Sequence, residues 1–115
     1  MNTISSDDAR LLMSKWKNEG SRLHVVFTEG GEGMEFPSCV FDVQPDFLIL
    51  ARYSSAGFWI WLREATFKYA EPREAPERIR ARSESKFEGC LEVSWPAGGK
   101  CLLYELRLVD RTGEA

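Results

Sequence analysis

The sequence has little of what catalysis, metal binding or secretion usually requires. Among 115 residues there are one histidine and three cysteines, and no Cys-x-x-Cys pair occurs. Structural zinc sites need about four His or Cys ligands at regular spacing, and disulfide frameworks of secreted proteins use even numbers of cysteines. The sequence also lacks a Gly-x-Ser-x-Gly elbow and a glycine-rich phosphate loop. We therefore expect no metal, no cofactor, no disulfide and no enzyme activity.

Long apolar runs and an excess of basic residues are also missing. No stretch approaches the ~20 apolar residues of a membrane helix, and the first residues lack the basic start and apolar core of a signal peptide. Lys and Arg number 15 against 18 Asp and Glu, for a net charge of −3. Nucleic-acid-binding proteins usually carry a basic excess. The sequence predicts a soluble, cytoplasmic single domain over residues 1–115, without a membrane partner and with RNA binding disfavoured.

What is present begins with the signature of one amphipathic helix. Ser5 or Ser6 can cap its first turn, and two aspartates follow at the positive end of the helix dipole. Gly20 is a natural left-handed stop. One apolar stripe lies between these ends, at the spacing i, i+3, i+4 and i+7: Ala9, Leu12, Met13 and Trp16. This pattern predicts a helix over residues 6–19 with Trp16 as its core anchor.

After Gly20 the apolar period changes from 3.6 to 2, which is typical of strands. Turn residues divide residues 21–69 into five predicted strands: 22–28, 34–43, 47–53, 58–62 and 66–69. The third and fourth of these are apolar on both faces, whereas a strand of a one-sided antiparallel sheet alternates. The fourth strand and its neighbour therefore supply a candidate oligomer interface: Phe58, Trp59, Ile60, Trp61 and Phe67.

The C-terminal part divides into a charged loop and a hairpin. Two prolines and nine charged residues interrupt the pattern over residues 70–86, and strands over 87–95 and 100–109 follow within a hairpin spanning 87–110. Pairing Trp95 with Lys100 places Val93 opposite Leu102, Leu91 opposite Tyr104, Cys90 opposite Glu105 and Cys101 opposite Ser94. In that register the two cysteines lie roughly 13 Å apart, beyond disulfide reach.

The charged loop contains the one local concentration of basic residues. Arg78, Arg80 and Arg82 would line one face of an extended chain and could clamp an anion or a phosphate backbone. Four glutamates surround them, so a solvated, self-neutralised loop is the simpler interpretation.

Two short segments have a known pattern. Residues 41–50 read as an aromatic, Asp, two variable residues, Pro45, Asp46 and an apolar run, and residues 61–67 read as an apolar pair, Arg63, Glu64 and then polar residues before an apolar one. Over about residues 6–70 this order resembles the Sm-like (LSm) family, which has Met and Asn at the first pair of positions and Gly in place of Glu64. The resemblance implies a small, strongly bent antiparallel barrel after one helix.

The same resemblance implies an RNA pocket formed by Gln44, Asp46 and Arg63. Only Arg63 keeps the family's residue type, and the carboxylate of Asp46 replaces an amide that donates and accepts. The family also assembles into rings by pairing edge strands, which suits the apolar strand over 58–62.

Together these observations predict a mainly β (α+β) protein: an N-terminal helix, an Sm- or SH3-like barrel over residues 21–69 and an added C-terminal hairpin. The expected function is a noncatalytic assembly or interaction module that forms homo-oligomers. Two alternatives are RNA or nucleotide binding at the positions above, and a small apolar ligand held between barrel and helix by Trp59 or Trp61.

Overall fold

The computed structural model describes residues 2–52, 55–70 and 85–108. Its elements are β1 (Asn2–Ile4), α1 (Ser6–Glu19), β2 (Arg22–Glu29), β3 (Glu32–Val43), β4 (Phe47–Arg52), β5 (Ser55–Trp61), β6 (Thr66–Ala70), β7 (Ser85–Ser94) and β8 (Lys100–Leu108). The helix and all seven predicted strands are confirmed within a few residues. Strand β1 is an addition, because three residues are too few to show a period.

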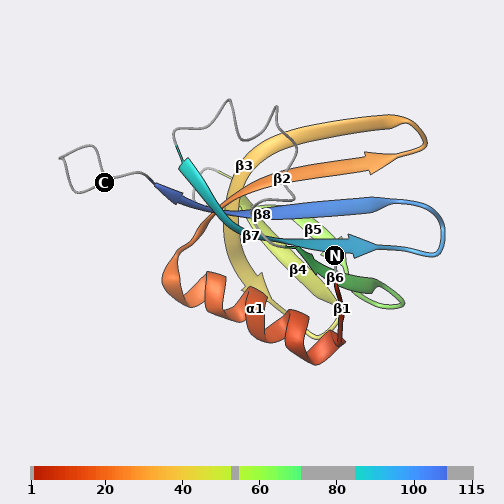
Figure 1. Ribbon diagram of the computed structural model, residues 1–115, viewed down its shortest axis with the longest axis horizontal. Coiled ribbons are helices and arrows are strands. Elements are labelled where there is room, and N and C mark those ends of the chain that lie inside the picture. The colour runs from red at the N-terminus through yellow and green to blue at the C-terminus, as the bar shows by residue number, and fades with distance from the viewer. Residues whose placement is uncertain (1, 53–54, 71–84, 109–115) are drawn as a thin grey trace.

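The helix forms where its caps and stripe predict it. The Ser5 hydroxyl accepts a hydrogen bond from the amide of Asp8 at 3.0 Å, and Gly20 ends the helix at φ +63°. Ala9, Met13 and Trp16 are fully buried. Figure 1 shows α1 lying along one side of the curved sheet, where it packs mainly on β3. This helix is too short and too polar to cross a membrane, and the described residues contain no other that could.

The eight strands form one antiparallel sheet in the order β1-β6-β7-β8-β2-β3-β4-β5 (Figure 1). The long strand β3 pairs with β2 along its first part and with β4 along its last residues. Its pairing with β4 shifts between Val40 and Asp42. Such a bulge bends a strand and increases its twist. The described sheet is not closed, and β1 and β5 are its edges.

The structure corrects the predicted place of the C-terminal hairpin. Strands β7 and β8 lie in the middle of the sheet, between β6 and β2, rather than beside a barrel completed by residues 21–69. The core accordingly draws on the helix, the early strands and the hairpin alike, with Trp16, Leu23 and Leu103 all fully buried in one cluster.

The predicted register of the hairpin is wrong by one residue. Lys100 pairs with Ser94, not Trp95, and Cys101 and Leu103 lie opposite Val93 and Leu91. Trp95 belongs to the turn, where its amide donates to the carbonyl of Gly99 at 3.0 Å. This turn is therefore one residue longer than the one assumed from the sequence.

The corrected register leaves the disulfide prediction intact. Cys90 lies opposite Tyr104 and Cys101 opposite Val93, three positions away along β7 and thus on the other face of the sheet. Both thiols, and that of Cys39, are free.

Candidate functional site

The edge strand β5 carries the most exposed tryptophans of the described residues. Phe58 and Ile60 turn toward the core, whereas Trp59 and Trp61 alternate outward with 58% and 42% of their surface exposed. The strand Ser55–Trp61 contains no charged residue and no proline. Natural edge strands usually carry such residues because they discourage pairing with other chains. An uncharged edge with exposed indoles is therefore suited to contact a partner.

Strand β4 holds the two indoles in place from the side. The Phe47 ring meets Trp59 and Trp61 edge to face, with ring centroids 5.3 and 4.7 Å apart. Ile49 pairs with Trp59 across the strands and is only 3% exposed. These cross-strand contacts fix the aromatic side chains more firmly than an isolated surface tryptophan would be fixed.

The hydrogen bonds at β5 show which backbone groups face outward. The Leu62 amide donates to the carbonyl of Asp46, toward β4, whereas the carbonyl of Trp61 accepts from the Trp95 indole Nε1 at 2.7 Å on the other side. Because successive residues of an antiparallel strand alternate in direction, the N–H and C=O of Trp59 also face the open edge. A docking strand would find both backbone groups of Trp59 there.

A groove of about 530 Å³ lies beside this edge, between β5 and the ends of the β2–β3 and β7–β8 hairpins. We call it the β5 groove; its lining is Phe27, Glu29, Trp59, Ile60, Trp61, Arg63, Glu64, Trp95, Pro96, Ala97 and Gly99. Trp95 is oriented by its bond to Trp61 and by its ring contact with Phe27, whose centroid lies 6.0 Å away.

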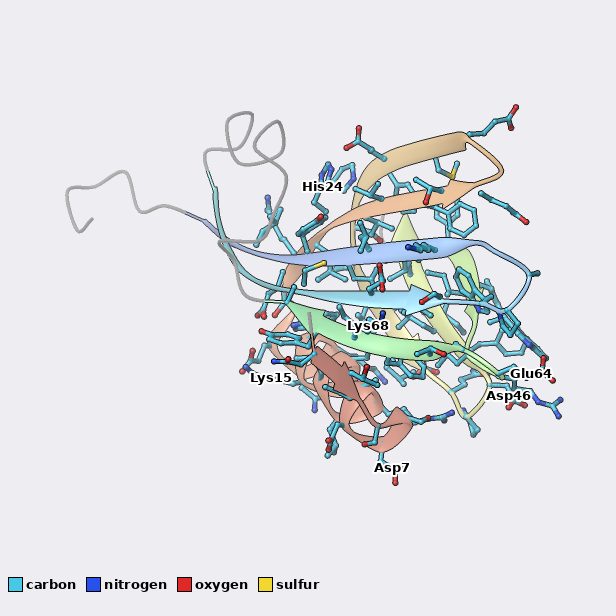
Figure 2. The ribbon with its side chains drawn as sticks, turned by 45° about the vertical axis from the view of Figure 1, so that its right-hand side comes forward. Asp7, Lys15, His24, Asp46, Glu64 and Lys68 are labelled. Carbon is cyan, nitrogen blue, oxygen red and sulfur yellow. The ribbon has the colours of Figure 1, made fainter. Side chains whose placement is uncertain are left out.

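Charged groups of both signs border the groove. The Arg63 guanidinium lies 5.7 Å from the centroid of the Trp61 ring, and its Nε is 3.9 Å from the Asp46 carboxylate. Glu64 adopts φ +62°, a left-handed conformation that favours glycine. Figure 2 shows Asp46 and Glu64 at the same end of the molecule, and His24 well away from them.

The three positions of the predicted RNA pocket are brought together only in part. Arg63 and Asp46 are neighbours, but the Gln44 side-chain amide donates to Asp42 at 3.4 Å. Asp42 also accepts from Lys17 at 2.9 Å, and this bond above all holds the pKa of Asp42 below its usual 3.8. The predicted residues Arg78, Arg80 and Arg82 lie outside the described residues.

The predicted oligomer interface divides between surface and core. Trp59 and Trp61 are exposed and Phe58 is half-buried, but Ile60 is 8% and Phe67 3% exposed. The side chains of Ile60 and Phe67 belong to the core cluster, and of the two only Ile60 also lines the β5 groove. Ile60 is buried because side chains alternate between the two faces along β5. Phe67 is buried where it lies opposite Val93 of the inserted hairpin.

Seven lining residues of the groove were not among the predicted site residues: Phe27, Glu29, Glu64, Trp95, Pro96, Ala97 and Gly99. The sequence feature that could have indicated Phe27 and Trp95 is an aromatic residue a few positions before a glycine pair, at the end of each hairpin. Their meeting with β5 depends on the strand order, which no local pattern contains.

Other reactive side chains of the described part do not gather at the groove. His24 contacts Glu35 at 3.2 Å on β2 and β3. Burial raises the pKa of the Cys101 thiol to about 12. Within the described ranges no three His, Cys, Asp or Glu side chains are placed to hold a metal ion.

Comparison with models of known protein families, with curated proteins and with solved structures found no match to this chain.

Proposed function

We propose that this protein is a noncatalytic interaction module that associates with a second copy of itself through β5. One observation carries the proposal: β5 is an uncharged edge strand with two exposed, well-supported tryptophans. An exposed apolar strand of this kind tends to pair with another chain unless it is covered.

A second copy fits the edge because antiparallel pairing of two identical strands is self-complementary. Each β5 offers the outward N–H and C=O of Trp59 to the other, and a two-fold axis buries the same surface on both copies. Tryptophan is enriched at the centre of protein interfaces because it buries a large apolar area at little entropic cost. Burial of both indoles supplies the apolar part of the contact.

We further propose that the bent sheet is a small barrel of Sm or SH3 type, enlarged by the inserted β7–β8 hairpin. Support comes from Glu64, whose left-handed backbone occupies the position where the Sm-like pattern has glycine. The three free thiols fit a reducing compartment such as the cytoplasm.

The two alternative functions have weaker support. An RNA base at the Sm-like positions would meet Asp46, whose negative charge lies beside Arg63 and opposes phosphate. An apolar ligand between helix and sheet would have to displace the fully buried Trp16, while Trp59 and Trp61 line the open groove instead.

Sedimentation velocity over a range of concentrations tests the proposal. We expect a rise from the monomer mass to twice that mass, and Trp59→Lys should abolish it, since charge on an edge strand opposes pairing. Leu11→Lys is the matched control, because Leu11 is 70% exposed on α1, away from β5. A monomer at every concentration, or equal effects of both variants, would refute self-association through β5.

A further inference from the structure

The β5 groove combines two chemical features that an apolar contact surface does not need. Three of its lining residues are tryptophans, namely Trp59, Trp61 and Trp95. Two others, Glu29 and Glu64, are acidic and exposed. Indole rings attract cations through their negative faces, and carboxylates attract them through charge. The two features therefore favour the same kind of ligand.

The charge balance of the groove supports this preference. Among the described residues that line it, Arg63 is the only basic one, and the carboxylate of Asp46 lies 3.9 Å from Arg63 Nε. The two carboxylates of Glu29 and Glu64 thus outnumber the single guanidinium of Arg63, even before Asp46 is counted. An anionic ligand would be repelled, and a purely apolar one would take the carboxylates out of water without a partner, which costs free energy.

Arg63 itself shows that an indole at this site accepts a cation. Its guanidinium lies 5.7 Å from the centroid of Trp61, within the range of cation–π contacts. Trp95 is held in a fixed orientation by its bond to the carbonyl of Trp61. A second cation entering the groove would therefore meet rings that are already placed, at little entropic cost.

We propose that the β5 groove binds a lysine side chain carried by an extended peptide segment of a partner protein. The peptide backbone runs beside the outward groups of Trp59 on β5, and the lysine ammonium enters between the tryptophans toward Glu29 and Glu64. A volume of about 530 Å³ admits the lysine together with parts of its neighbours, as in other ligand sites. This partner is distinct from the second copy of the proposed function, although both use the β5 edge.

Binding of short synthetic peptides to the full chain tests this inference. The probes are acetylated, amidated peptides of alternating threonine and valine with lysine, norleucine or glutamate at the centre. Isothermal titration at low salt gives their affinities, at protein concentrations where sedimentation shows monomer. We expect the lysine peptide to bind about tenfold more tightly than the norleucine peptide, and the glutamate peptide to bind most weakly.

Two variants connect that preference to the groove. The double change Glu29→Gln and Glu64→Gln should reduce the preference for lysine to about twofold or less, while norleucine binding stays the same. Glu19→Gln is the control, since Glu19 is an exposed carboxylate at the end of α1. All three substitutions are on exposed side chains, and circular dichroism verifies the fold.

The outcomes separate this inference from self-association. Equal affinity for lysine and norleucine, or a preference that survives the double change, overturns the lysine site even if the chain dimerises. A lysine preference in a chain that stays monomeric supports the site and overturns only the proposed second copy.

Discussion

The contact between Gly89 and Tyr69 offers a sharp test of where the C-terminal hairpin lies. Tyr69 pairs with Leu91 across β6 and β7, so Gly89 is its diagonal neighbour on the same face. A Cβ atom built on Gly89 would lie 2.6 Å from Cζ of Tyr69 and nearer still to its hydroxyl oxygen. The ring would have to move to about 3.4 Å or more, the range of ordinary contact. This close approach exists only because β7 is next to β6.

Gly89→Ala should therefore destabilise the protein by about 1–3 kcal/mol, the usual cost of overpacking a filled site. The backbone of Gly89 is outside the left-handed region, so alanine itself adds no strain there. In a Tyr69→Ala background the space is free, and Gly89→Ala should instead stabilise by roughly 0.5–1 kcal/mol, because alanine suits a strand better than glycine. The effect of the same substitution changes sign.

Urea unfolding followed by tryptophan fluorescence measures all four proteins of this double-mutant cycle. Gly20→Ala is a control, because Gly20 has φ +63° and no atom within 4 Å of a built Cβ. Its cost of about 1–2 kcal/mol comes from the left-handed backbone and should not depend on Tyr69. An equal loss for Gly89→Ala in both backgrounds would refute the β6–β7 pairing and with it the inserted hairpin.

Three further predictions concern the helix, an ion pair and the thiols. Ser5→Ala should lower the free energy of unfolding by about 1 kcal/mol, because the Asp8 amide loses its cap, and thermal unfolding checks this; no change would show that the cap is not formed. Asp42→Asn should lower the melting temperature at pH 7, since Lys17 depresses the pKa of Asp42 in the folded state. The stabilisation is complete above the unfolded value near 3.8 and is lost as pH falls through the lower folded pKa, so the two melting temperatures should converge in acid; a constant difference would contradict the ion pair. Iodoacetamide at pH 8 should modify half-buried Cys39 long before Cys101, whose pKa is raised to about 12, as peptide mass spectrometry can show; equal rates would contradict the burial of Cys101.

Local patterns predicted the elements well because their causes are local. The caps Ser5 and Gly20 and the stripe ending at Trp16 specify α1 without help from the sheet. The Gly30-Gly31 turn, with both residues at positive φ, joins β2 to β3 by the two-residue hairpin that such a pair favours.

The predicted register of the hairpin was wrong because the sequence pattern of β8 does not indicate which of its two faces is buried. Cys101 and Leu103 enter the main core, while Leu102 and Tyr104 belong to a second cluster on the opposite face. A strand that is apolar on both faces fits either register, and a shift of one residue exchanges the faces.

The candidate site was predicted only where it follows from β5 itself. The two-sided apolar pattern of residues 58–62 predicted a contact surface that includes the exposed Trp59 and Trp61, but it also assigned Ile60 and Phe67 to that surface, although both are buried. The other wall of the groove, with Phe27 and Trp95, comes from pairings between residues far apart in the chain.

Amide hydrogen exchange of Trp59 is the most direct test of association through β5. Its N–H faces the open edge, so it should exchange quickly in dilute protein. It should become protected at concentrations where sedimentation shows a dimer, because a partner strand then accepts its hydrogen bond. The amide of Leu11 on α1 should exchange equally at both concentrations. A dimer in which Trp59 still exchanges as fast as in the monomer would contradict pairing of the two β5 edges.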